Sequence, residues 1–159
     1  MLIIADTSPL ISLLLIDKLY LLDELYGSYC IPEAVWQELT SHNAISTYKS
    51  ELEQLSKKIQ KTSYQVFPIN GIDIGETECI LLYKELQANY LLIDDKKARE
   101  VAQWNDIKCI GTLTVLYKAK EKGYLTQLRD LFLKLLEHKR FYSKLIMNFF
   151  LEQANEKLL

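Results

Sequence analysis

The chain has 159 residues, of which 49% are hydrophobic, so it is long enough to bury a full core in one domain without disulfides or a structural metal. Its net charge of -2 and isoelectric point near 5.7 exclude a protein that holds nucleic acid by bulk positive charge. The three widely spaced cysteines and the lack of an apolar stretch of about 20 residues predict a cytoplasmic protein with no membrane segment.

Short apolar runs followed by helical segments recur along the chain. Residues 1–5 (MLIIA) predict a buried strand, and a helix is expected to begin near Pro9. The same order recurs at residues 28–31 before EAVWQEL, at 90–93 before KKAREVAQW and at 107–110 before LTVLYKAKEKG. Strands that alternate with helices predict an α/β fold with a parallel sheet covered on both faces.

The segments between these units are less regular. Residues 44–61 predict a polar, lysine-rich helix, residues 65–68 a short strand, and residues 75–87 a further helix.

The last part of the chain has no strand signal, and its apolar residues recur at helical spacing. We expect an α/β domain over residues 1–125 and a C-terminal helical extension over residues 126–159, packed on the same domain. The helical spacing predicts core packing, rather than a groove for a partner, for Leu131, Leu135, Leu145 and Phe149.

Five acidic residues lie at the edges of apolar runs: Asp6, Glu38, Glu76, Asp94 and Asp95. Asp6 follows the first strand, and the Asp94-Asp95 pair follows another. The carboxyl ends of parallel strands lie at one edge of a sheet, where open α/β sheets bind ligands. Capping of the next helix is the alternative role for Asp6 and for one of the two paired aspartates.

Glu38 and Glu76 lie within predicted helices. Glu38 is about 100° from Leu39 on the helical wheel, so it could face either the site or solvent. Glu76 shares a stripe with Cys79, and a carboxylate on a core-facing stripe needs a partner. The alternative role of Glu76 is a capping box with Asp73.

Carboxylates that crowd together repel one another, and a bound cation stabilises their ionised forms. The cluster therefore predicts Mg²⁺ or Mn²⁺ and hydrolysis of a phosphodiester. The chain has no phosphate-binding glycine loop of the ATPase or dinucleotide type. Its short basic runs, at residues 96–99, 118–122 and 138–140, are candidate patches for a local contact with nucleic acid, although such runs on helices are more often ordinary solvated surface.

Five segments in order, IIADTSPLI, IPEAVWQEL, GETECILL, LLIDDKKAREVA and GTLTVLYKAKEKG, resemble a PIN domain, in particular the prokaryotic DUF3368 subgroup. The resemblance implies an α/β/α sandwich whose acidic pocket binds Mg²⁺ or Mn²⁺ and cleaves single-stranded RNA. It also implies a dimeric toxin of a type II toxin-antitoxin pair, silenced by a cognate antitoxin. Matched by motif, its acids are Asp6, Glu38, Glu76 and either Asp94 or Asp95.

Glu76 stands where the family usually has an aspartate, so metal distance or occupancy could differ. One alternative is a PIN-like module that binds RNA or protein without turnover. A phosphoryl-transfer enzyme with Asp6 as its nucleophile would resemble proteins with D-x-D after the first strand, but Ser8 occupies the second position.

Overall fold

A central sheet of four parallel strands organises the computed structural model, which describes residues 1–159. The strands are β1 (Leu2–Ala5), β2 (Ser28–Cys30), β3 (Tyr90–Leu92) and β4 (Cys109–Ile110), in the order β2-β1-β3-β4. Ile4 of β1 pairs with Cys30 on one side and with Leu91 on the other. The predicted α/β class and parallel sheet are confirmed.

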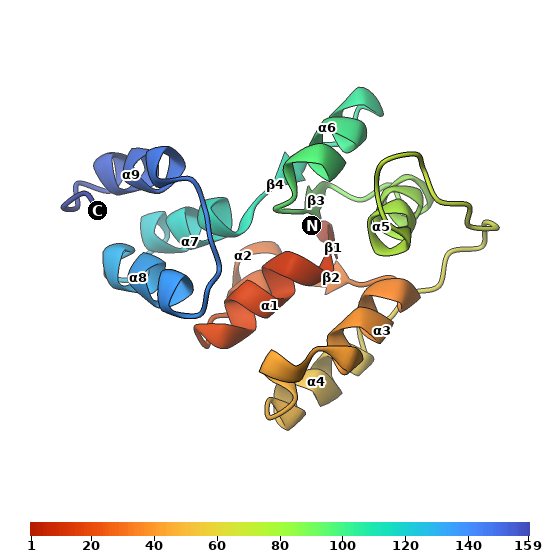
Figure 1. Ribbon diagram of the computed structural model, residues 1–159, viewed down its shortest axis with the longest axis horizontal. Helices are drawn as coiled ribbons and strands as arrows, with labels where there is room; N and C mark the ends of the chain where they lie inside the picture. Colours follow the sequence, from red (N-terminus) through yellow and green to blue (C-terminus); the bar gives the residue numbers. More distant parts are fainter.

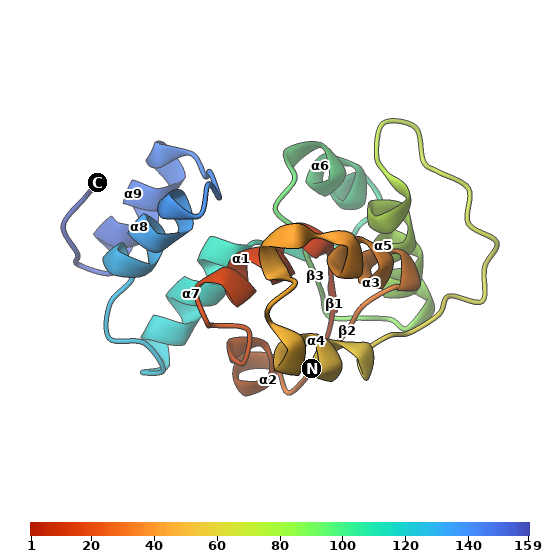
Figure 2. The same ribbon diagram turned by 60° about the horizontal axis from the view of Figure 1, so that its bottom comes forward.

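Helices cover both faces of this sheet (Figure 1). Figures 1 and 2 place α1 and α7 on one side of the strands and α3 and α5 on the other, with α8 and α9 beyond α7. The helices are α1 (Thr7–Leu15), α2 (Leu21–Tyr26), α3 (Glu33–Ser41), α4 (Lys49–Ser56), α5 (Ile74–Glu85), α6 (Lys96–Trp104), α7 (Thr112–Glu121), α8 (Arg129–Glu137) and α9 (Lys144–Gln153).

The apolar runs form the strands because both sides of the sheet are buried. Ile3, Ile4 and Leu91 have no exposed surface, as expected for strands between two helical layers. The same hydrophobic core continues without a break to Leu151 in α9. The C-terminal helices therefore share one core with the α/β body. No helix has the length and apolarity needed to cross a membrane.

Two predicted elements differ from the structure. The predicted helix at residues 44–61 is instead a 3-10 turn, η1 (Asn43–Ile45), followed by the shorter α4. Residues 65–68 form no strand, because the segment extends from the sheet and pairs with no neighbour.

The predicted core positions of the extension are only half correct. Leu131 and Leu135 of α8 are buried, but Leu145 and Phe149 of α9 are 81% and 55% exposed. Helix α9 instead buries Met147 and Leu151. Positions two residues apart on a helix point about 200° away from each other, so the stripe through Leu145 faces solvent when the stripe through Met147 is buried.

Candidate functional site

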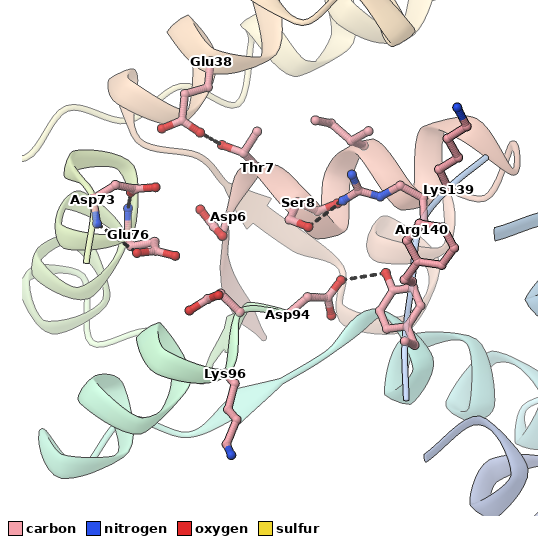
Figure 3. Close-up of a pocket in the computed structure, with 14 residues that line it drawn as sticks. Asp6, Thr7, Ser8, Glu38, Asp73, Glu76, Asp94, Lys96, Lys139 and Arg140 are labelled. Carbon is pink, nitrogen blue, oxygen red and sulfur yellow. Dashed lines mark hydrogen bonds between the residues drawn. The ribbon is translucent and has the colours of Figure 1, made fainter. Parts of the chain in front are cut away.

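An open pocket of about 570 Å³ lies at the carboxyl edge of the sheet (Figure 3). Its acidic side chains come from the residues that follow β1 and β3, from the start of α5 and from the middle of α3. All five acids predicted from the sequence line this pocket, together with one further acid, Asp73: they are Asp6, Glu38, Asp73, Glu76, Asp94 and Asp95.

Asp6 is the most deeply buried of these acids, with 5% of its surface exposed. Its backbone N–H donates to the carbonyl of Leu92 at 3.0 Å, which fixes the end of β1 against the end of β3. Asp6 occupies the N-cap position of α1, but its side chain makes no capping hydrogen bond. The carboxylate is therefore not used to start the helix, and it points into the pocket (Figure 3).

The surroundings of Asp6 disfavour its charged form. Burial is the largest cause, and it raises the pKa of Asp6 from 3.8 to about 8. The backbone amide of Thr7 opposes this shift, whereas the negative charges of Glu76 and Glu38 add to it. A cation in the pocket would favour the ionised carboxylate.

Glu38 reaches the pocket from α3, so of its two possible orientations the structure shows the one toward the site. Its Oε2 accepts a hydrogen bond from the hydroxyl of Thr7 at 2.5 Å. Its Oε1 lies only 2.5 Å from the position that a Cβ on Gly75 would take. Glycine therefore lets the carboxylate approach the first turn of α5. Burial is the main cause that raises the pKa of Glu38, and the Thr7 hydrogen bond opposes it.

Glu76 forms the capping box that the sequence offered as its alternative role. Its backbone N–H donates to Oδ1 of Asp73 at 2.8 Å, and its Oε2 accepts from the backbone N–H of Asp73 at 3.0 Å. Both residues also line the pocket, so capping and facing the site are compatible. Burial raises the pKa of Glu76, and the charges of Asp73, Asp95 and Glu38 raise it further.

The two adjacent aspartates after β3 have different partners. Asp94 accepts hydrogen bonds from the N–H of Thr112 at 2.8 Å, from its hydroxyl at 2.6 Å, and from the hydroxyl of Tyr142 at 2.8 Å. Asp95 is the N-cap of α6, where its Oδ1 accepts from the N–H of Ala98 at 2.8 Å. Asp95 Oδ2 forms no hydrogen bond, whereas both oxygens of Asp94 are engaged.

Three cations also line the pocket: Lys96 follows Asp95 at the start of α6, and Lys139 and Arg140 lie in the linker between α8 and α9 (Figure 3). The sequence offered their basic runs as candidate patches for nucleic acid but favoured ordinary solvated surface. Tyr142 lines the pocket too, and together with Asp73 it was missed as a site residue. Only the capping spacing of Asp73 was visible in the sequence. The linker between α8 and α9 carried no motif that could show where it folds.

The comparisons with known proteins agree with this architecture. The sequence matches the DUF3368 family, described as a PIN domain, over residues 2–156. The chain belongs to the DUF3368 family of PIN domains. A PilT N-terminus domain protein from the hyperthermophilic archaeon Sulfolobus solfataricus P2 has a similar fold, with a TM-score of 0.53 and 15% identity over 75% of this chain and 93% of that chain. No curated protein matches the sequence.

PIN domains are usually nucleases and typically use divalent metal ions. The acids of this PIN domain suit such an ion, because carboxylate oxygens are the ligands that Mg²⁺ and Mn²⁺ prefer. No three of them converge closely enough to surround one ion by themselves. Mg²⁺ keeps several of its waters and usually takes only one or two carboxylates directly, so the donor set still fits.

Proposed function

We propose that this PIN domain is a metal-dependent endoribonuclease that cleaves single-stranded RNA. The observation that carries the proposal is the burial of Asp6 among other carboxylates at the edge of the sheet. A buried acid that neither caps its helix nor forms an ion pair costs the folded protein free energy. Its retention there is explained if a divalent cation occupies the pocket during function.

Asp6, Glu38, Glu76 and Asp95 would hold the metal, one or two of them directly and the others through its bound waters. Asp95 is preferred over Asp94 because it has an oxygen free of hydrogen bonds, and its charge acts on Glu76. Asp94 instead ties the end of β3 to α7 and to Tyr142.

When bound, Mg²⁺ or Mn²⁺ would polarise the scissile phosphate and lower the pKa of a bound water, so that the water attacks without a histidine base. Other side chains and backbone groups of the chain orient the carboxylates that would hold the metal. Thr7 fixes Glu38 by its hydrogen bond, and the capping box fixes Glu76 at the start of α5. Thr7 and Ile11 line the pocket on the α1 side.

Single-stranded RNA is proposed as the substrate on the family relationship and on the shape and charge of the pocket. The pocket is open, and Lys96, Lys139 and Arg140 line it together with the acids. This local positive charge gives a chain with a net charge of -2 a place to hold phosphates.

The family relationship extends the proposal to a type II toxin, held silent by an antitoxin and active as a homodimer. The exposed apolar side chains of α9 support a protein partner, because a second chain would remove them from water. Expression in a bacterial host, with and without the neighbouring small open reading frame, tests the toxin role. Light scattering of the purified chain tests the dimer.

A cleavage time course tests the nuclease. The full-length protein would be incubated with labelled single-stranded RNA in Mn²⁺, Mg²⁺ or EDTA, alongside Asp6→Asn. We expect cleavage in the metals, none in EDTA, and none with the variant. Mn²⁺ binding without cleavage in any metal would favour the PIN-like binding module instead.

A further inference from the structure

The linker between α8 and α9, which we call the strap (residues 138–143), crosses one wall of the acidic pocket. Arg140 anchors the strap on α1: its Nε donates to the hydroxyl of Ser12 at 2.9 Å, and its Nη2 donates to the carbonyl of Ser8 at 3.0 Å. Tyr142 anchors the other end, because its hydroxyl donates to Asp94 at 2.8 Å. The strap is therefore held on the rim of the site from two sides (Figure 3).

The cations of the strap have no carboxylate partners. Neither Arg140 nor Lys139 forms an ion pair, although six acids line the same pocket. Arg140 makes its hydrogen bonds to neutral groups, which orient the guanidinium and leave its charge unneutralised. Such a cation fits an anion that arrives from outside the protein.

Lys139 occupies a backbone conformation that does not favour lysine. Helix α8 ends in a Schellman-type turn, in which the N–H of Arg140 donates to the carbonyl of Leu135 at 2.8 Å and Lys139 has a φ of 57°. Glycine is the usual residue at this position, because it has no Cβ to clash. A lysine there accepts some backbone strain and places a positive charge on the rim of the pocket.

An aromatic ring lies between the two anchors of the strap. Phe141 lines the pocket and is 76% exposed, so its ring contributes little to the core. Exposed aromatic rings next to cations are the combination that binds single-stranded nucleic acids, because bases stack on the rings and phosphates contact the cations.

We propose that the strap is a binding subsite for single-stranded RNA beside the metal site. Arg140 and Lys139 bind a phosphate that neighbours the one at the acids, and Phe141 stacks on a base. This inference rests on the proposed nuclease function, because that function places a phosphate of the RNA at the acids. RNA binding can nevertheless be measured without cleavage. The C-terminal extension thus supplies substrate contacts to the site formed by the α/β body.

Fluorescence anisotropy of a labelled RNA decamer tests the subsite in the full-length Asp6→Asn protein with Mg²⁺, so that cleavage does not interfere. Phe141→Ala should weaken binding about fivefold or more. Lys139→Gly should weaken it and reduce the salt dependence of log K by about 0.7. Because glycine suits the backbone at that position, Lys139→Gly should not lower the melting temperature.

Two matched controls lie on α9, outside the pocket. Phe149→Ala removes an exposed ring, and Lys144→Ala removes an exposed charge, from the same extension. Both should leave RNA binding unchanged. The inference is overturned if the strap variants bind RNA as tightly as their parent, if the controls weaken binding equally, or if the parent binds no RNA. Absence of cleavage by the unmodified protein would instead overturn the nuclease proposal, whatever the anisotropy shows.

Discussion

The hydroxyl of Tyr142 donates a hydrogen bond to Oδ2 of Asp94 at 2.8 Å, joining residues 48 positions apart in the chain. The same carboxylate accepts hydrogen bonds from the backbone N–H and the hydroxyl of Thr112 at the start of α7. Asp94 therefore connects the sheet edge, α7 and the C-terminal extension. Its neighbour Asp95 keeps one oxygen free at the pocket. The adjacent aspartates should therefore respond differently to the loss of their charge.

Asp94→Asn should lower stability, and Asp95→Asn should lower metal affinity. In the Asp94→Asn variant the new amide would turn an N–H₂ group toward donors, which costs about 1–3 kcal/mol in the free energy of unfolding. Asparagine is a good N-cap, so Asp95→Asn preserves the start of α6. Its Mn²⁺ affinity should nevertheless fall by about tenfold or more, or ~1.4 kcal/mol.

Urea unfolding and Mn²⁺ titration calorimetry of both variants check this division. Tyr142→Phe is the matched control, because it removes one donor to Asp94 and should cost about 1 kcal/mol. The reverse pattern, with metal affinity lost in Asp94→Asn alone, would contradict the assignment of Asp95 as the ligand.

Glu76→Gln should separate the two roles of Glu76. Glutamine also serves in a capping box, so the start of α5 should persist and stability should change by less than about 1 kcal/mol. Removal of the charge should weaken Mn²⁺ binding and slow cleavage. Thermal denaturation and Mn²⁺ calorimetry measure the two effects. Unchanged metal affinity would mean that Glu76 acts only as a cap.

Gly75→Ala should slow cleavage without unfolding the protein. The added Cβ would lie 2.5 Å from Oε1 of Glu38, so the carboxylate must move away from α5. Alanine is the better helix former, which offsets part of the strain in the free energy of unfolding. Cleavage rates would be measured in Mn²⁺.

The effect of Gly75→Ala should largely disappear in a Glu38→Gln background, because both changes act on the same carboxylate. Strictly additive losses in this double-mutant cycle would show that Gly75 acts by another route.

Without metal, stability should fall as the pH rises from about 4 to 8. Burial raises the pKa of Asp6 from 3.8 to about 8, so in this range the folded protein keeps a proton that the unfolded chain has released. The free energy of unfolding then decreases by up to about 1.4 kcal/mol per pH unit. Urea unfolding in EDTA at several pH values measures this slope.

Asp6→Asn should flatten this dependence and stabilise the metal-free protein near pH 8, whereas Asp17→Asn, at an exposed position, should leave it unchanged. An equal slope in the Asp6→Asn variant would refute burial of a protonated Asp6.

The sequence predicted the parts of this protein that depend on local periodicity. The apolar runs at β1 and β3 identified the strands, and their parallel arrangement brought Asp6 and Asp95 to one edge. Glu38 remained ambiguous on the helical wheel, because packing of α3 against α5 decides which way it faces. The convergence of these acids supports the predicted site, and their roles as metal ligands stay predictions.

The strap could not be predicted, because its position depends on contacts between residues more than 120 positions apart. A short basic run has the same appearance in the sequence whether it lies in solvent or on the rim of a pocket. The exposure of Leu145 was missed for a related reason: helix α9 has two apolar stripes, and only tertiary packing selects the one that is buried.

The rate of RNA cleavage as a function of Mn²⁺ concentration tests the central claim most directly, when Mn²⁺ occupancy is measured on the same protein by electron paramagnetic resonance. We predict that the rate rises in proportion to occupancy, falls to background in EDTA, and that Asp6→Asn loses both binding and cleavage. Cleavage that persists in EDTA or in Asp6→Asn would contradict a metal-dependent site at the carboxyl edge of this sheet.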